Sequence, residues 1–568
     1  MKEKSKSLIL AGLLLCVCCL NSVNLIQNNS ALVSAQSSRT VGLFLDDASA
    51  FQGYTLLAPK QYTTTYLIDN NGDVVNTWKS QYAPGQSAYL LPNGNLIRAG
   101  SIINPNINTG GGDGGIIQEF NWAGSIVWQL TYSNDTCAQH HDFTVLPDGD
   151  VLMLVVQKYT YEQAIDAGFN PSYLQAVQSM GYILPDTVVE VKPTLPVGGT
   201  VVWAWNVMDH LIQNYNASAA NYGNVTAHPE LINPNGGGNQ IPVFWNHMNS
   251  ITYNPTLDQI MLSVRGNSEI WIIDHSTTTA QAASHTGGTY ARGGALLYRW
   301  GNPSQYGAGN QSNEMLFQQH DAVWIPTGYP GAGDILVFNN GLGRGYSSVD
   351  EFTPPLEANG SYALMAGSAY GPTNLAWTWD ANPPTSLYAQ DICGAQRLPN
   401  GDTLICDGVN GTLFEVTANG KEVWDYVNSV VKTGPLGVSD SIPPDPAKSG
   451  EFLNEIFKVE RYAPDYAGLQ GENLTAGNPI ETYSTSPSPT PSPTIAPTST
   501  PAPTLNPTST ATTSSSPSSS SSPSPSPTAT PSIPELPLLA AVLPLIIVAA
   551  PVTLRFRNKK LRKQLGYK

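Results

Sequence analysis

The chain has 568 residues, of which 12% are charged, and its formal net charge is −16 at neutral pH. An acidic chain offers no electrostatic reason to bind nucleic acid, so we expect no nucleic-acid partner. Glycine and proline are frequent, with 51 and 45 residues. Helical patterns are few, which favours an all-β protein rich in turns.

The N-terminus has the pattern of a secretory signal peptide. Three lysines within the first six residues precede an apolar run over 8–20, and small residues at 33–35 provide a cleavage site before Gln36. We predict a signal peptide over residues 1–35, with an uncleaved anchor as the alternative. Its removal would leave three cysteines. Cys393 and Cys406 lie diagonally across an ideal hairpin, where a disulfide would require a bulge.

Residues 36–482 repeat one phrase, in which a strand that ends in tryptophan is followed by a strand that ends in a Pro/Asn/Asp/Gly turn. The tryptophans are Trp78, Trp128, Trp203, Trp300, Trp379 and Trp424. The turns lie at 91–94, 146–149, 254–258, 325–334 and 398–401. This repeat is typical of a β-propeller, and we predict six blades. A β-sandwich is the alternative, but it does not account for a tryptophan that recurs in the same phrase.

Two insertions interrupt the repeat. Residues 159–182 carry apolar residues at helical spacing, which predicts a short helical excursion over one face. Residues 205–243 are polar and rich in glycine, which predicts a rim or lid loop. Sequons for N-glycosylation lie in predicted loops, as an exported glycoprotein requires. They begin at Asn134, Asn216, Asn224, Asn310, Asn359, Asn410 and Asn473.

The C-terminal part has the pattern of a membrane anchor. Residues 483–532 are almost entirely Ser, Thr and Pro, which predicts a disordered, O-glycosylated stalk. Residues 533–555 contain an apolar segment long enough for a transmembrane helix, and the basic residues of 556–568 predict a cytoplasmic tail. We therefore expect the propeller to lie outside the cell, held at the cell surface by this helix. The stalk and basic-tailed helix are similar to the surface anchors of archaeal exported proteins.

A second phrase occurs three times and places nitrogen-bearing side chains at one level. His141 and His320 lie six residues ahead of the proline of a turn, and Asn249 has this position in the third copy, with His247 two residues earlier. Because side chains alternate along a strand, equal spacing puts them on the same face of equivalent strands. We expect them to converge as exposed residues of the central channel. The plainer alternative is that the His-Asp pairs decorate strand edges, with each Asp capping a turn.

Arg265 belongs to this group, because it continues the hairpin of His247 and interrupts an apolar strand. An ion pair between blades is the alternative. Three histidines also suggest a metal, but a fixed cation repels a divalent ion and no carboxylate shares the register, so we expect no metal. The set suits an anion with several oxygens. The glycine-rich segment 111–115 lacks a following Lys-Ser/Thr and no other nucleotide motif is present, so we expect no cofactor.

These phrases resemble those of the nucleotide-independent (PAPS-independent) arylsulfotransferases of bacteria and archaea. The similarity covers most of residues 60–466 and includes HHDFTVLPDGD, NHMNSITYNPTLDQIMLSVRG, FQQHDAVWIP with its closing NNG, and FKVERYAPDY. The resemblance implies a six-bladed propeller with its site in the central channel. The N-terminal sandwich domain of some members has no place between the signal peptide and the first blade, and the oligomeric state stays open.

The resemblance also implies roles for the candidate residues. His320 would be the nucleophile, and Asn249 would help to position the transferred group. The ligands of the sulfuryl oxygens would be His141, His247 and Arg265. His140 competes with His141 for its role and is a second candidate for substrate binding.

The predicted function is transfer of a sulfuryl group from an aryl sulfate to a phenol through a sulfohistidine, in a ping-pong mechanism. The partners would be small molecules, namely the aryl sulfate and the phenol. Two other functions stay open. One is a cell-surface binding propeller without turnover, and the other is a hydrolase in which the histidines coordinate a metal.

Overall fold

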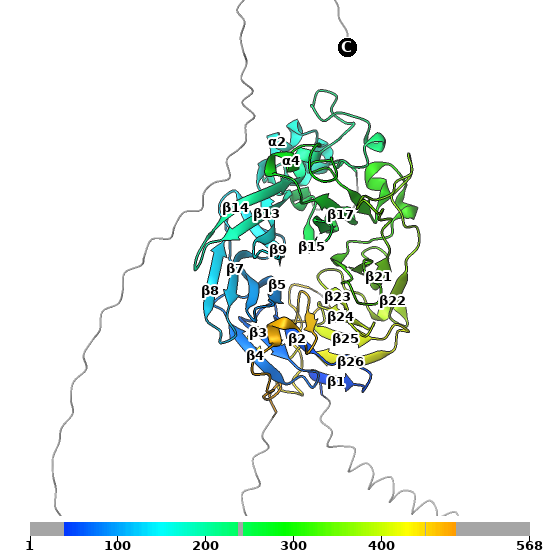
Figure 1. Ribbon diagram of the computed structural model, residues 1–568. Helices are drawn as coiled ribbons and strands as arrows, with labels where there is room; N and C mark the ends of the chain where they lie inside the picture. Colours follow the sequence, from blue (N-terminus) through cyan, green and yellow to red (C-terminus); the bar gives the residue numbers. More distant parts are fainter. Residues whose placement is uncertain (1–38, 237–241, 449, 484–568) are drawn as a thin grey trace, which may run out of the picture. The chain divides into compact units, whose positions relative to one another are not determined.

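The computed structural model describes residues 39–236, 242–448 and 450–483 of the chain (Figure 1). The predicted signal peptide, transmembrane helix and basic tail lie outside these residues, as does the stalk apart from its first residue. The expectations for these segments therefore stay predictions. None of the helices that the structure describes is long and apolar enough to cross a membrane.

The described residues form six antiparallel sheets that surround a common axis, with β5, β9, β15 and β23 near the centre and β8, β14, β22 and β26 at the periphery (Figure 1). The predicted six-bladed β-propeller is confirmed. Blade 1 contains β29 (Glu460–Tyr462), β2 (Tyr54–Leu57), β3 (Thr64–Ile68) and β4 (Val74–Lys79). Blade 2 contains β5 (Pro84–Leu90), β6 (Leu96–Ser101), β7 (Gly115–Phe120) and β8 (Ile126–Thr131). Blade 3 contains β9 (Cys137–Val145), β10 (Val151–Gln157), β13 (Asp186–Pro193) and β14 (Gly199–Asn206).

The other three blades follow in chain order. Blade 4 contains β15 (Met248–Asn254), β16 (Gln259–Val264), β17 (Glu269–Asp274) and β18 (Tyr298–Trp300). Blade 5 contains β19 (His320–Trp324), β20 (Ile335–Asn339), β21 (Ser348–Phe352) and β22 (Trp377–Asp380). Blade 6 contains β23 (Gly394–Arg397), β24 (Thr403–Asp407), β25 (Thr412–Val416), β26 (Glu422–Val427) and β1 (Gly42–Asp46).

The ring is closed by both ends of the described chain. Strand β29, from the C-terminal end, pairs with β2 as the innermost strand of blade 1, while β1, from the N-terminal end, pairs with β26 at the outer edge of blade 6. Each end thus completes a blade built mainly from the other part of the chain. The strand edges that remain are the inner and outer edges of the blades, which are short and protected in a propeller.

The core consists of layers between neighbouring blades. Each of six apolar clusters in the described residues takes side chains from two adjacent blades. Successive residues of one strand enter different layers: Leu56 packs toward blade 2 and Leu57 toward blade 6. Because both faces of these strands are buried, they read as continuous apolar runs and not as an alternating pattern.

The recurring tryptophans connect the blades. In every blade an indole N–H from the fourth strand donates to a main-chain carbonyl in the link between the third and fourth strands of the next blade, over 2.7–3.1 Å. The donors are Trp78, Trp128, Trp205, Trp300, Trp377 and Trp424. In blades 3 and 5 the donor is therefore not Trp203 or Trp379 but the tryptophan two residues away. A buried indole N–H needs an acceptor, which accounts for the recurrence of this residue.

The predicted helical excursion is confirmed. Between the short strands β11 (Tyr159–Thr160) and β12 (Tyr182–Ile183) lie α2 (Tyr161–Asp166), α3 (Pro171–Leu174) and the 3-10 turn η1 (Gln175–Val177). Irregular chain with short 3-10 turns makes up the described part of 207–247. These turns are η2 (Val207–His210), η3 (Val225–Ala227) and η4 (Pro242–Phe244).

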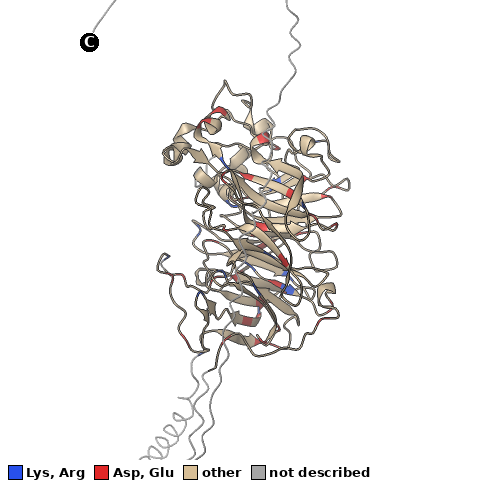
Figure 2. Ribbon diagram, turned by 90° about the vertical axis from the view of Figure 1, so that its left-hand side faces the viewer, with Lys and Arg blue, Asp and Glu red and all other residues tan. Residues whose placement is uncertain are grey.

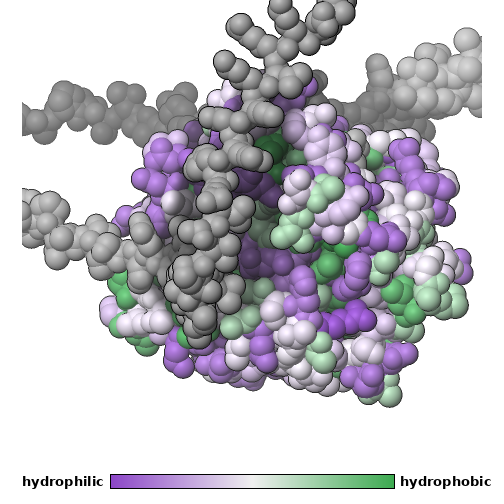
Figure 3. All heavy atoms as spheres, turned by 90° about the horizontal axis from the view of Figure 1, so that it is seen from above, coloured by the Kyte–Doolittle hydropathy of each residue, from purple (hydrophilic) through white to green (hydrophobic). Residues whose placement is uncertain are grey.

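The remaining elements are short. They are η5 (Arg265–Asn267), α4 (Thr279–Ala282), η6 (Pro303–Tyr306), η7 (Gln311–Asn313), η8 (Pro384–Ser386), β27 (Val430–Val431), β28 (Gly434–Pro435) and η9 (Ala467–Leu469). Charged residues are sparse along the blades (Figure 2). On the face seen from above, small apolar patches alternate with hydrophilic residues (Figure 3). The three cysteines of the described chain are free, buried thiols, so Cys393 and Cys406 form no disulfide.

Candidate active site

The innermost strands of blades 2 to 5 share a β-bulge at the same level, where pairing with the second strand shifts register. Non-glycine residues with positive φ lie at these bulges or beside them: Gln86 (91°), His141 (46°), His247 (49°) and Asp321 (54°). Such residues persist only where the surrounding structure holds them, and they concentrate at functional sites. The bulges break the plain alternation that the sequence argument assumed.

The structure brings the candidate histidines together at the inner ends of blades 3, 4 and 5. The ring centroids of His141 and His247 are 5.0 Å apart, and Phe457 lies 6.0 Å from His141 and 6.4 Å from His320. His247 immediately precedes β15 and is half-buried. His320 is only 1% exposed, so the expectation of an exposed channel residue is wrong. His247 is therefore the most exposed of the three histidines.

All three imidazoles are held in the neutral state. Burial and the nearby Arg265 lower the pKa of His320 to about 3, although a hydrogen bond with Asn340 raises it. Burial and Arg265 also place the pKa of His247 well below its usual range. For His141 the causes are burial and the neighbouring histidines, His247 first. Neutral imidazoles have a lone pair that can attack an electrophile, whereas imidazolium ions have none.

Arg265 does not lie within a strand, contrary to expectation. It follows β16 as the first residue of η5, and its N–H donates to the carbonyl of His247 over 3.2 Å. No ion pair of the described residues includes its guanidinium, and its buried Nε lacks a hydrogen-bond partner. The alternative of an ion pair between blades is therefore wrong. Burial lowers the pKa of Arg265, an effect that Asp391 opposes, and the guanidinium remains a cation.

Asn249 lies within the bulge of β15 and is fully buried. Its Nδ2 donates to the carbonyl of Gln319 over 2.8 Å, while its Oδ1 has no partner. Asn249 thus joins blade 4 to the main chain of Gln319, the residue before His320.

His140 lies beside the cluster and not within it. Its Nδ1 is 2.7 Å from His141 Nδ1, and its Nε2 is 2.8 Å from Asp186 Oδ1. Asp186 Oδ2 in turn accepts from the N–H of Met248, at the start of β15. His140 therefore links His141 to Asp186 of β13, and His141 is the member of the pair whose ring lies beside that of His247, tilted by 58°.

The two Asp residues that follow the histidines belong to a buried ionic network. Lys458 Nζ lies 3.1 Å from Asp142 Oδ2 and 2.9 Å from Asp321 Oδ1. Asp142 also accepts from Tyr89 Oη over 2.6 Å and from the N–H of Ile251 over 3.1 Å. The interpretation of these Asp residues as turn caps is wrong. The network holds the main chain beside His141 and His320, and Lys458 comes from the closing FKVERY phrase.

His320 has two hydrogen bonds that the sequence argument missed. Its Nδ1 is 2.7 Å from Asn340 Oδ1, and its Nε2 accepts from the N–H of Ile392 over 3.2 Å. Asn340 belongs to the NNG phrase that closes the hairpin, which was the only sequence signal for it. Asp391, beside Ile392, carries a buried Oδ1 without a hydrogen-bond partner, and its charge favours the cationic form of Arg265.

The glycine-rich segment packs directly on the site. The N–H of His141 donates to the carbonyl of Gly112 over 3.2 Å, and a Cβ on Gly112 would lie 1.9 Å from His141 Cε1. A Cβ on Gly110 would lie 2.4 Å from the ring of Phe244. Only glycine permits this approach of the main chain. The segment therefore shapes the site. The sequence showed only that the segment does not match a nucleotide-binding motif, and it did not predict this role.

Several buried polar atoms around the cluster have no hydrogen-bond partner among the described residues, so they are available to a polar ligand. They include Gln86 Oε1, Trp245 Nε1, Asn246 Nδ2, Asn249 Oδ1, Arg265 Nε and Asp391 Oδ1. No group of three His, Cys, Asp or Glu side chains in the described chain has the arrangement of a metal site.

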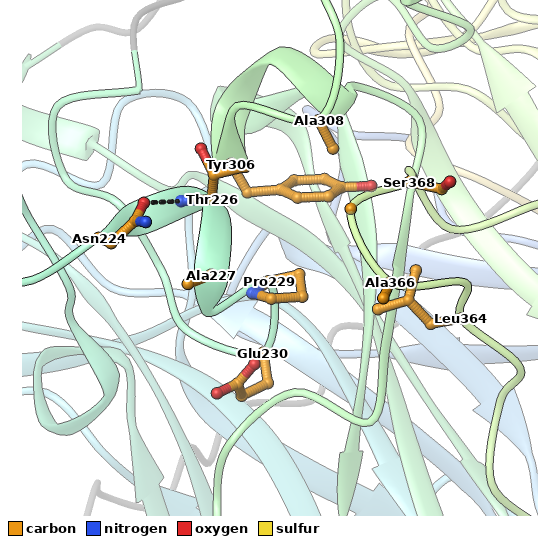
Figure 4. A pocket seen from close by; sticks show the side chains of 11 residues that line it. Asn224, Thr226, Ala227, Pro229, Glu230, Tyr306, Ala308, Leu364, Ala366 and Ser368 are labelled. Carbon is orange, nitrogen blue, oxygen red and sulfur yellow. Dashed lines mark hydrogen bonds between the residues drawn. The ribbon is translucent and has the colours of Figure 1, made fainter.

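A separate pocket of about 470 Å³ lies outside this cluster and contains none of the candidate residues. Tyr306, Leu364 and Ser368 line it together with Asn224 and Glu230 (Figure 4). Asn224 Oδ1 accepts from the N–H of Thr226 over 3.1 Å, so this amide is used within the loop. The cluster of histidines, and not this pocket, is the candidate active site.

Fold and site define a β-propeller with neutral histidines and one arginine gathered at its axis. The family model for arylsulfotransferase (ASST) matches residues 46–434. The chain therefore belongs to the arylsulfotransferase family. Among curated proteins, none matches the sequence.

Two solved structures illustrate what the chain is similar to. A protein of unknown function from Bacteroides caccae shares 12% identity over 72% of this chain and 98% of its own, with a TM-score of 0.37. Virginiamycin B lyase from Staphylococcus aureus shares 9% identity over 70% of this chain and 87% of its own, with a TM-score of 0.32.

Proposed function

We propose that this protein transfers a sulfuryl group from an aryl sulfate to a phenol through a sulfohistidine on His320. The proposal depends on one observation. A neutral His320, whose Nε2 has a lone pair, lies in the same cluster as Arg265, His141 and His247. Membership of the arylsulfotransferase family supports the general activity and does not favour a propeller without turnover.

The first half-reaction forms one bond and breaks another. Nε2 of His320 attacks sulfur, the N–S bond forms, and the S–O bond to the aryl group breaks with its electron pair leaving as a phenoxide. In the second half-reaction the oxygen of the acceptor phenol attacks sulfur, and the N–S electron pair returns to Nε2. The proton that the acceptor loses balances the one that the first phenoxide takes up.

Charge stabilisation comes from the groups around the sulfuryl oxygens. Arg265 offers a planar fork of donors, which fits two oxygens at once, and His141 and His247 can donate when the tautomer is suitable. These groups are buried or half-buried, where hydrogen bonds to an anion are stronger than in water. Transfer of a sulfuryl group resembles phosphoryl transfer, in which positioning and electrostatics supply most of the catalysis.

The aromatic side chains beside the histidines fit an aryl substrate. Phe457 contacts the rings of His141 and His320, and the ring centroid of Phe244 lies 6.0 Å from that of His247. Aromatic rings favour stacked or edge-on neighbours, so an aryl group gains contact area here that an alkyl sulfate would not.

The cellular location is part of the proposal. The predicted signal peptide, Ser/Thr/Pro stalk, apolar helix and basic tail together support an archaeal-type exported enzyme anchored at the cell surface. Protease treatment of intact cells should release an active fragment by cutting the stalk. Release only after lysis would reverse the orientation.

The enzyme itself is tested by trapping its intermediate. Full-length protein given a chromogenic aryl sulfate without acceptor should release one phenol per chain and gain one sulfuryl group, which peptide mapping at mildly alkaline pH should place on His320. Added phenol should remove the label. His320→Asn should abolish label and turnover, whereas His210→Asn, a change at another fully buried histidine, should keep both.

Each other outcome points to a different function. Stoichiometric binding of the aryl sulfate without phenol release would indicate a binding propeller. Release of inorganic sulfate that needs no acceptor and is abolished by a chelator would indicate a metal hydrolase. A label on another residue sinks the assignment of His320.

A further inference from the structure

Asn340 is held in one orientation by the main chain. Its Nδ2 donates to the carbonyls of Ala389 over 3.0 Å and Ile392 over 3.1 Å. Both donors of the amide are thereby used, and the fully buried side chain can turn only its Oδ1 toward His320. An amide oxygen is an acceptor and never a donor. The nitrogen 2.7 Å away, His320 Nδ1, must therefore carry a proton.

The second nitrogen of His320 gives the complementary observation. The N–H of Ile392 donates to Nε2 over 3.2 Å, and a nitrogen that accepts a hydrogen bond cannot itself be protonated. A neutral imidazole carries one proton, so two independent contacts place it on Nδ1. The partner of one ring nitrogen thus decides the state of the other, as the hydrogen-bond partners of metal-binding histidines do.

We propose that Asn340 is a positioning residue that fixes His320 in the Nδ1–H tautomer and thereby makes Nε2 the nucleophile. This inference rests on the proposed function of His320. The Nδ1–H···Oδ1 hydrogen bond also disperses the positive charge that the ring acquires when the N–S bond forms. In this respect Asn340 does for a nucleophilic imidazole what a carboxylate does for the base of a catalytic triad, without adding a negative charge.

Ile392 takes part in the same exchange. Its N–H donates a hydrogen bond to the lone pair of His320 Nε2 in the resting site. This hydrogen bond must break when Nε2 attacks sulfur. The N–H then faces the new sulfuryl group and can donate to one of its oxygens. Ile392 adopts a left-handed backbone conformation with φ of 48°, and Asn340 holds it through the carbonyl of Ile392. The same amide therefore positions both the nucleophile and this main-chain donor.

The first test reads the tautomer directly and needs no turnover. Full-length protein carrying ring-15N histidine should give an Nδ1 signal typical of a protonated nitrogen and an Nε2 signal typical of an unprotonated one, assigned by their loss in His320→Asn. In Asn340→Ala the two tautomers should mix. A wild-type His320 with its proton on Nε2 overturns the inference whatever the activity.

The second test separates positioning from folding. Asn340→Ala should lower kcat on the order of 10- to 100-fold with little change in KM, as loss of the group that orients a reactive side chain does. Asn339→Ala is the matched control, because Asn339 is equally buried and its amide bonds Asp350 and main-chain groups but not His320. The control should lower the melting temperature as Asn340→Ala does and leave the tautomer and kcat in place.

Two failures can be told apart. If wild-type protein never gains a sulfuryl group on His320, the proposed function fails. If it does, and Asn340→Ala keeps both the Nδ1–H tautomer and the wild-type kcat, or if the control loses kcat to the same extent, then only the role of Asn340 is refuted.

Discussion

Removal of the buried cation Lys458 should destabilise the propeller strongly. The side chains of Lys458, Asp142 and Asp321 are 3%, 0% and 4% exposed, so Lys458→Met would leave two carboxylates buried without their counter-ion. The two carboxylates raise the pKa of Lys458 well above its usual range, although burial by itself lowers it. The cation is therefore present at all physiological pH values.

The expected cost can be worked out from these contacts. At about 3 Å and an effective dielectric constant of about 20, each ion pair corresponds to roughly 5 kcal/mol of attraction, most of which offsets the desolvation of the charges. Loss of one partner of a buried pair costs about 3–5 kcal/mol. For a domain of about 440 residues, an unfolding entropy of about 0.9 kcal/mol/K converts this into a drop of roughly 3–6 °C in melting temperature.

The assay is thermal unfolding of Lys458→Met beside two comparison variants. Lys421→Met breaks an ion pair with Asp47 whose side chains are 63% and 33% exposed, and it should shift the melting temperature by about 1 °C or less. A triple variant that adds Asp142→Asn and Asp321→Asn removes the uncompensated charges and should recover part of the loss. Equal shifts for Lys458→Met and Lys421→Met would refute the reasoning.

Three further outcomes are expected. Arg265→Ala should cost about 2–4 kcal/mol in kcat/KM with unchanged melting, and Arg265→Lys should restore only a small part, because an ammonium lacks the planar fork. Gly112→Ala should reduce turnover at least about 10-fold by pushing on His141, whereas Gly371→Ala, which meets open space, should not. The melting temperature should fall as pH rises above about 6.5. The pKa of His275 is raised in the folded protein, so His275 adds stability at pH values below its unfolded-state pKa, and this stability is lost as pH rises through its folded-state pKa. His275→Gln should flatten this dependence.

The physical basis of the pH effect is a bridge between blades 3 and 4. His275 Nε2 lies 2.9 Å from Glu190 Oε2, and its Nδ1 lies 2.7 Å from Asp258 Oδ1. Burial alone lowers the pKa of His275, but these two hydrogen bonds raise it overall. A melting temperature independent of pH in this range, in wild-type protein, would show that the bridge adds no stability.

The blade repeat and the convergence of the histidines could be read from the sequence, because they depend on local spacing. A strand and its turn fix which way a side chain points, and a repeated phrase implies repeated geometry. The tryptophan phrase in particular reflects one hydrogen bond made six times. The arrangement of Arg265 beside His247 also follows from one hairpin.

Other features were decided by contacts between residues far apart in the chain. Lys458 meets Asp142 across 316 positions and Asp321 across 137, and Asn340 is held by carbonyls 49 and 52 positions away. No spacing rule links such residues, because the turns and insertions between them set their distance in space. The bulges that give His141 a positive φ are equally invisible in the sequence.

The sequence by itself therefore determined the propeller, which follows from a periodic pattern along one chain, and the resemblance of its phrases indicated the family and the candidate residues. Only the tertiary structure decided the state of those residues. Burial makes His320 neutral, and the hydrogen bonds with Asn340 and Ile392 determine which ring nitrogen carries the proton. The main chain of Gly112 packs against the ring of His141. The physical reason is that pKa and tautomer depend on the dielectric and the hydrogen-bond partners around a group, which exist only once the blades have closed into a ring.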